Sequence, residues 1–93
     1  ELAGNKVDEG ELTALKEAAA DGDMQARFDY AEAAFAAGHR DAAADELLAM
    51  FEADREWNDG ASRTKLLQIF EAVGLEDPWV VATRRRLSKI LFG

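Results

Sequence analysis

The sequence predicts an all-α fold, a right-handed stack of helical hairpins with about five helices. Three observations lead to this prediction. The 93 residues contain one proline and no run of alternating apolar and polar residues that would favour a strand. Apolar residues recur at helical spacing in five segments, and Gly, Asp or Asn residues separate these segments. A short motif also occurs twice at a separation typical of stacked hairpins.

The first three helices are separated by clear end signals. The first is expected from about Glu9 to Ala20, and the second from residue 24 to 37. Asp23 can cap the second helix, because its carboxylate can accept hydrogen bonds from first-turn N–H groups. Gly38 can end it, because a left-handed backbone is without steric cost for glycine. The apolar residues expected on its inner side are Phe28, Ala31 and Phe35, with Tyr30 and Ala34 beside that face.

The third helix is expected over residues 41–53, with Ala43 where it crosses the second helix. A small side chain at that position lets two helix backbones approach closely. The other residues expected on the buried side are Leu47, Met50 and Phe51.

A tryptophan and a turn then lead into the fourth helix. We expect Trp57 to pack as a structural wedge between the third and fourth helices, and Asn58 or Asp59 to cap the fourth. Gly74 is expected to end this helix. Its apolar face, which includes Leu66, Leu67, Ile69, Phe70 and Val73, is wide enough to contact two neighbours.

The fifth helix has a strong start signal. Asp77 can serve as N-cap, and Pro78 suits the first helical position, where its missing N–H is not needed. The helix is expected to continue to about Phe92.

The repeated motif is "AFAAG" at residues 34–38 and "FEAVG" at residues 70–74, which lie 36 residues apart. This separation is close to the period of tetratricopeptide repeats, which are helix–turn–helix units. Two departures make the repeat imperfect: Arg55 stands where the pattern usually has proline, and Trp79 stands where a small crossing residue belongs.

The segment "WNDGASRTKLLQIFEAVGLEDP", followed by "RRRLSKILF", resembles the C-terminal domain of the thioredoxin-fused chaperone family, known as YbbN, CnoX or chaperedoxin. The resemblance covers residues 24–92 and is most specific from Trp57 onward. It implies a bacterial cytoplasmic holdase that binds unfolding clients and the chaperonin GroEL, with a thioredoxin-like domain before this one. The chain, which begins at Glu1, is therefore expected to be a single tetratricopeptide-like domain, residues 1–93, of a longer protein.

Charge is unevenly distributed along the chain. Residues 1–62 hold 5 Lys/Arg and 16 Asp/Glu, whereas residues 63–93 hold 6 Lys/Arg and 3 Asp/Glu. On the fifth helix, Arg85 and Lys89 share the outer face, and Phe92 lies off the apolar stripe. Arg85 and Lys89 can form a docking face for an acidic partner. Phe92 can separately serve as an apolar anchor for a groove of a partner. Alternatively, the cations complement the acidic helices of the same chain, and Phe92 closes the end of the stack.

A second candidate surface is the inner face of the second helix. Phe28 and Glu32 occupy the places where some tetratricopeptide domains hold a peptide carboxylate with Lys and Asn. An apolar and an acidic side chain suit hydrophobic segments of unfolded clients better. The alternative function is a scaffold module that binds one specific protein and has no chaperone role.

The sequence offers little support for catalysis or cofactor binding. It contains no cysteine, and its single histidine, His39, follows a helix-ending glycine. Asp21–Glu32 fits a calcium-loop template only partly, because Ala26 replaces the turn glycine. We therefore expect no enzyme activity, metal or cofactor. The net charge of −8 argues against nucleic acid, and no apolar run is long enough to predict a membrane span.

Overall fold

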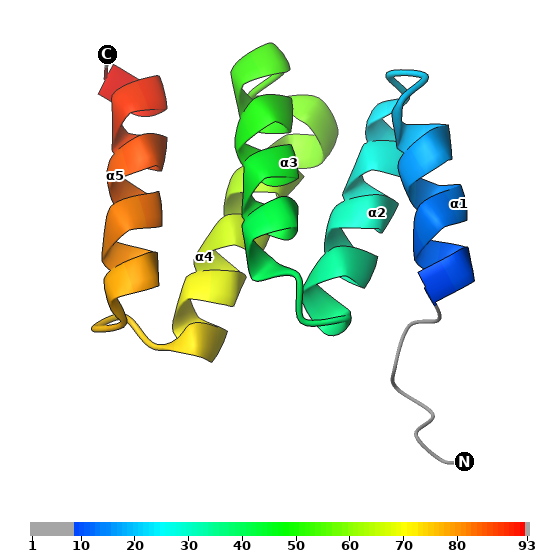
Figure 1. Cartoon of the computed structure of the whole chain (residues 1–93). Helices are drawn as coiled ribbons and strands as arrows, with labels where there is room; N and C mark the ends of the chain where they lie inside the picture. Colours follow the sequence, from blue (N-terminus) through cyan, green and yellow to red (C-terminus); the bar gives the residue numbers. More distant parts are fainter. Residues whose placement is uncertain (1–8, 93) are drawn as a thin grey trace. The chain divides into compact units, whose positions relative to one another are not determined.

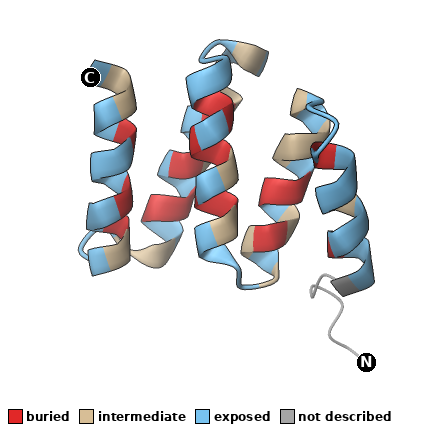
Figure 2. Ribbon diagram, turned by 45° about the horizontal axis from the view of Figure 1, so that its top comes forward, coloured by how far each residue is buried: buried red, intermediate tan, exposed pale blue. Residues whose placement is uncertain are grey.

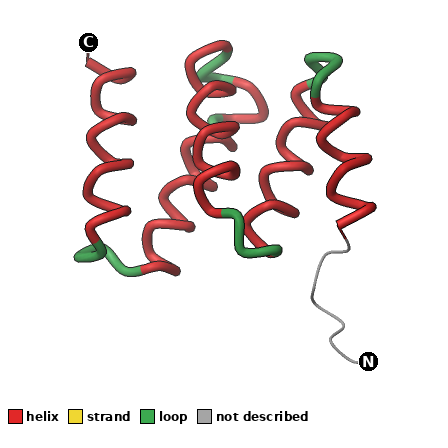
Figure 3. The backbone as a smooth tube through the Cα atoms, in the orientation of Figure 1, coloured by secondary structure: helices red, strands yellow, loops and turns green. Residues whose placement is uncertain are grey.

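The computed structural model describes residues 9–92, which form five α-helices and one 3₁₀ turn (Figure 1). The helices are α1 (Glu9–Ala19), α2 (Met24–Ala36), α3 (Arg40–Ala53), α4 (Ala61–Val73) and α5 (Pro78–Phe92), and the turn is η1 (Trp57–Asp59). This described part contains no strand (Figure 3). The predicted all-α fold is confirmed, and the predicted bounds of the first three helices lie within one residue of the observed ones.

The chain divides into two compact units between Leu47 and Leu48, within α3. The first unit holds α1, α2 and the first half of α3. The second holds the end of α3, η1, α4 and α5. The right-handed stacking of the hairpins and the assignment of residues 1–93 to a single domain stay predictions.

In the first unit, α1 and α2 lie side by side and run in opposite directions (Figures 1 and 3). Asp23 caps α2 as predicted, because its carboxylate accepts a hydrogen bond from the N–H of Ala26 at 2.9 Å. Gly38 adopts φ +93° after the last turn of α2. The N–H groups of Gly38 and His39 donate back into that turn at 3.0 and 2.8 Å. The predicted end of α2 is therefore confirmed, with a Schellman-type hydrogen-bond pattern.

Alanines form the centre of this unit. Ala31 and Ala34 of α2 and Ala43 of α3 are all 0% exposed. Because these side chains end at Cβ, they leave room for helix backbones to lie close together. Tyr30 is also buried, but Phe28 and Phe35, which we expected on the inner side, are only half-buried. The small residues fill the buried centre, and the two larger rings lie at its partly exposed edge.

An ion pair also links α2 to α3. The Arg27 Nε donates to a carboxylate oxygen of Glu46, and both side chains are largely shielded from solvent. The partners lie nineteen residues apart in the sequence, so helical periodicity alone did not indicate this contact.

In the second unit, Leu66, Ile69 and Phe70 form the buried face of α4. Gly74 ends this helix as predicted, with φ +123°, and its N–H donates to the Phe70 carbonyl at 2.9 Å. The predicted apolar face was too wide, because Leu67 is 38% exposed. A helix with this narrower stripe buries fewer of its apolar side chains than the sequence suggested.

The start of α5 is also confirmed. Pro78 is its first residue, and the Asp77 carboxylate accepts a hydrogen bond from the N–H of Trp79 at 2.8 Å. Val80, Thr83 and Leu87 are the buried residues of this helix. The Thr83 hydroxyl donates a hydrogen bond to the Trp79 carbonyl at 2.7 Å, so this buried polar group has a partner within the same helix.

The 36-residue repeat appears in the burial of the individual residues of α3 and α5. Figure 2 shows the buried residues in red. The three buried residues of α5 each lie 36 positions after a buried residue of α3, namely Ala44, Leu47 and Phe51. The correspondence fails at three places, one of which is Ala43, whose counterpart Trp79 is half-buried. Leu48 and Met50 of α3 are buried, whereas their counterparts Arg84 and Arg86 are exposed. The α5 helix is therefore buried on one side only, as is typical of a terminal repeat with a polar outer face.

The joint before α4 differs from its prediction. Gly60 is the N-cap of α4, with φ +80° and no side-chain capping hydrogen bond, so the predicted cap by Asn58 or Asp59 is wrong. Asn58 and Asp59 instead adopt φ 50° and 58° themselves. Asn, Asp and Gly tolerate this left-handed backbone best, which gives the Asn-Asp-Gly sequence a conformational role. Trp57 is half-buried, not the fully buried wedge we expected.

Replacing Ala43 by leucine should lower the free energy of unfolding by about 1–3 kcal/mol, because added methylenes must displace closely packed atoms. Denaturant melts of the wild type and Ala43→Leu would measure this loss. Ala49→Leu is the matched control, since Ala49 is exposed on the same helix and should tolerate the change. Equal stability of both variants would contradict the close crossing at Ala43.

The left-handed backbone of Asn58 and Asp59 leads to a second prediction. Asn58→Ala and Asp59→Ala should each destabilise the fold by about 1 kcal/mol, because alanine is strained at positive φ. Asn58→Gly and Asp59→Gly should be neutral or slightly stabilising, since glycine adopts this backbone freely. Thermal melts of the four variants test the difference; glycine variants less stable than the alanine ones would rule out the conformational role.

Candidate functional site

The outer face of α5 brings the predicted docking residues together. Arg85, Ser88, Lys89 and Phe92 surround a shallow groove of about 420 Å³ near the end of the helix. Their spacing of three and four residues places them on one helical face. Phe92 is 86% exposed, so within the described residues it does not close the end of the fold.

Arg85, Ser88, Lys89 and Phe92 form what we call the terminal patch, which combines charged and aromatic side chains. Within residues 9–92, neither Arg85 nor Lys89 has a hydrogen-bond or ion-pair partner. An exposed aromatic ring beside two available cations is suited to a surface that offers an apolar pocket with carboxylates at its rim. Aromatic and arginine side chains are also the residue types that most often dominate protein interfaces.

Arg55 supports the end of α5 from the segment that follows α3. Its Nη2 donates to the Ile90 carbonyl at 2.7 Å, and its guanidinium lies 5.4 Å from the centre of the Phe51 ring. The last carbonyls of a helix have no partner within the helix, so this bond satisfies one of them. From the sequence, Arg55 could be identified only as a departure from the repeat pattern. Its partner Ile90 lies thirty-five residues away, so helical spacing did not indicate this contact.

The other predicted surface lies on α2. Phe28 is half-buried and Glu32 is exposed, one helical turn apart. Tyr30 lies between them in sequence and therefore projects from the opposite side of α2. The predicted client-binding face and the side that carries Tyr30 are thus two different surfaces of the first unit.

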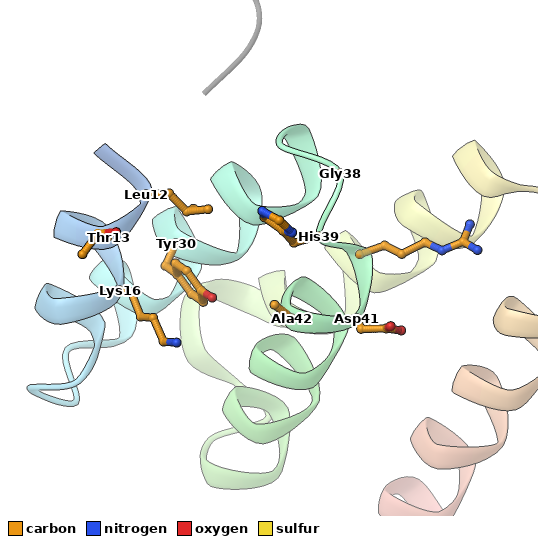
Figure 4. A pocket seen from close by; sticks show the side chains of 9 residues that line it. Leu12, Thr13, Lys16, Tyr30, Gly38, His39, Asp41 and Ala42 are labelled. Carbon is orange, nitrogen blue, oxygen red and sulfur yellow. The ribbon is translucent and has the colours of Figure 1, made fainter. Parts of the chain in front are cut away.

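A groove that the sequence did not predict lies on the Tyr30 side. Its larger hollow, of about 570 Å³, is enclosed by α1, α2 and the first turn of α3 (Figure 4). A second hollow of about 380 Å³ shares Lys16, Tyr30 and Ala42 with the first. The residues that line the larger hollow are Leu12, Thr13, Lys16, Tyr30, Gly38, His39, Arg40, Asp41 and Ala42. Three separate segments build it, so no local sequence motif could have revealed it.

Residues 9–92 offer neither a metal-ligand cluster nor a helix suited to crossing a membrane. This part of the chain contains no group of three or more His, Asp or Glu side chains placed to hold a metal ion. None of its helices has the length and apolar composition needed to cross a membrane. The calcium-loop template is largely helical, because α2 begins at Met24. His39 is an exposed turn residue, as predicted, and lines the larger hollow.

Comparison with known families gives a match over almost the whole chain. The model of a tetratricopeptide-repeat family covers residues 5–92. The chain therefore belongs to the tetratricopeptide-repeat family, whose domains are generally non-catalytic and bind protein partners. No curated protein and no solved structure gives a significant match.

Removal of the Arg55 side chain should loosen the end of α5. Arg55→Met keeps apolar contact with Phe51 but loses the hydrogen bond to Ile90, so amide exchange of Leu91 and Phe92 should accelerate. Arg55→Lys should restore part of the protection, because lysine can still donate. Hydrogen exchange measured by NMR tests this, with the amides of α2 as an internal control. Unchanged exchange at the end of α5 in Arg55→Met would refute the capping role.

Proposed function

We propose that this chain is the protein-binding helical domain of a thioredoxin-fused holdase, and that it docks onto the chaperonin through the terminal patch. The observation that carries the proposal is the exposed Phe92 flanked by Arg85 and Lys89. Membership of a protein-binding repeat family supports the general role. The resemblance from Trp57 onward supports the particular setting, a cytoplasmic protein with a thioredoxin-like domain before Glu1.

The proposed docking combines two contributions. Phe92 would enter an apolar pocket of the partner and supply most of the affinity, since buried aromatic anchors dominate interface energetics. Arg85 and Lys89 would pair with carboxylates at the rim and chiefly raise the association rate and selectivity. Unfolding clients would bind elsewhere, on the face that carries Phe28 and Glu32, because the half-buried Phe28 ring offers apolar surface.

The alternative is a scaffold module that binds one specific protein and has no chaperone role. The same patch favours it, because cations on either side of an aromatic ring suit one defined acidic partner better than many unrelated clients. The two functions differ in whether the full-length protein keeps an unfolding client soluble.

The docking proposal is tested by titrating the purified full-length protein with purified GroEL in a calorimeter. Phe92→Ser should weaken binding about tenfold or more, as for an aromatic hot spot. Lys89→Glu should weaken binding most at low salt, because the rim contribution is electrostatic. Arg84→Glu is the matched control, since Arg84 makes the same charge change on α5 outside the groove.

Two results would overturn parts of the proposal. Wild-type affinity in Phe92→Ser would exclude the terminal patch as the docking surface. Failure of the wild-type protein to reduce aggregation of chemically unfolded citrate synthase, combined with tight binding of one partner, would favour the scaffold function.

A further inference from the structure

The larger hollow lies at the N-terminus of α3. His39, which precedes the helix, and Arg40, Asp41 and Ala42 of its first turn line it. The aligned peptide dipoles of a helix place partial positive charge at its N-terminus, which favours a bound anion. The α3 helix has 14 residues, so its dipole is well developed.

Tyr30 gives an independent indication of a ligand. It is only 8% exposed, and Figure 4 shows its side chain directed into the hollow. Within residues 9–92 its hydroxyl has no hydrogen-bond partner. The hydroxyl is not among the buried polar atoms that lack a partner, so the ring is buried while the hydroxyl reaches solvent in the hollow. The hydroxyl is therefore available to a group that enters from outside.

Lys16 adds a third donor, from α1. Its side chain lines both hollows, and Figure 4 shows it beside Tyr30. Its ammonium has no ion-pair partner in the described part of the chain. An ammonium, a phenol hydroxyl and a helix N-terminus thus converge on one hollow from three helices. A carboxylate matches this set, because it accepts several hydrogen bonds and carries one negative charge.

Acidic residues near the groove restrict which residues can flank the bound carboxylate. Asp41 lines the larger hollow but projects away from Tyr30 in Figure 4. Glu46 lines the second hollow and is paired with Arg27. Asp45 lines the second hollow as well. A run of acidic residues would be repelled there, whereas small apolar or basic residues would fit beside Ala19 and Ala42.

We propose that this groove binds a protein segment with one isolated Asp or Glu side chain, which enters the hollow formed by Lys16, Tyr30 and the start of α3. The neighbouring residues of that segment, apolar or basic, lie along the second hollow. This site lies in the first unit, apart from the terminal patch, and does not depend on chaperonin docking. It gives the domain a second protein-binding surface.

The test uses two short, alanine-rich peptides with blocked ends. The first contains a single glutamate followed one helical turn later by a lysine. The second is identical except that a glutamine replaces the glutamate. Each is titrated into the ¹⁵N-labelled full chain and followed by NMR. The glutamate peptide should shift the amides of Arg40, Asp41 and Ala42, and it should bind at least tenfold more tightly than the glutamine peptide. Lys16→Gln and Tyr30→Phe should each reduce that preference severalfold. Lys89→Gln, the same charge change on α5, should leave it unchanged.

Tyr30→Phe keeps the buried ring, and Lys16 is exposed, so both variants should fold. Their fold is checked by the shifts of residues far from the groove. Equal affinity for the two peptides, or shifts confined to other surfaces, would overturn the proposal. Tighter binding of inorganic phosphate than of the glutamate peptide would also overturn it, in favour of a phosphate site.

Discussion

The first unit depends on a buried centre made from side chains that end at Cβ. Ala31 and Ala34 on α2 and Ala43 on α3 are completely buried in this unit. Because alanine loses no side-chain entropy on burial, these positions are packed without the ordering cost of larger residues. The hydrogen bonds beyond Gly38 fix where α2 ends and α3 begins, and so set which residues of each helix are buried. The groove on the Tyr30 side of α2 is lined by residues of α1, α2 and the start of α3, so its shape depends on how these three helices are held together.

The asymmetric burial of α5 determines the chemistry of its outer face. Where α3 buries Leu48 and Met50, the equivalent positions of α5 hold Arg84 and Arg86. Charged residues at these positions disfavour the packing of a further hydrophobic helix on the same side. The terminal patch with Phe92 follows from the same one-sided burial. Arg55 then holds the end of this helix through the Ile90 carbonyl, so the patch is presented on an ordered turn.

Local signals made much of the fold predictable. Asp23, Gly38 and the Asp77-Pro78 pair act within one helical turn, so their roles could be inferred from neighbouring residues alone. Spacing along one helix also placed Arg85, Lys89 and Phe92 on a common face. The contacts that the sequence did not reveal join distant segments, such as Arg55 with Ile90 and the lining of the groove. Asn58 and Asp59 were misassigned for another reason. The same residue types that cap helices also tolerate a left-handed backbone, and only the dihedral angles distinguish the two roles.

The claim that the buried alanine centre stabilises the whole first unit can be tested by native-state hydrogen exchange of the full chain. The amides of α2 around Ala34 and those of α3 around Leu47 should exchange only through global unfolding. Their exchange free energy should therefore equal the free energy of unfolding from denaturant melts, and it should fall in parallel as denaturant is added. If these amides instead exchange through local openings, with less protection than the amides of α5, the buried alanine centre is not what the first unit depends on.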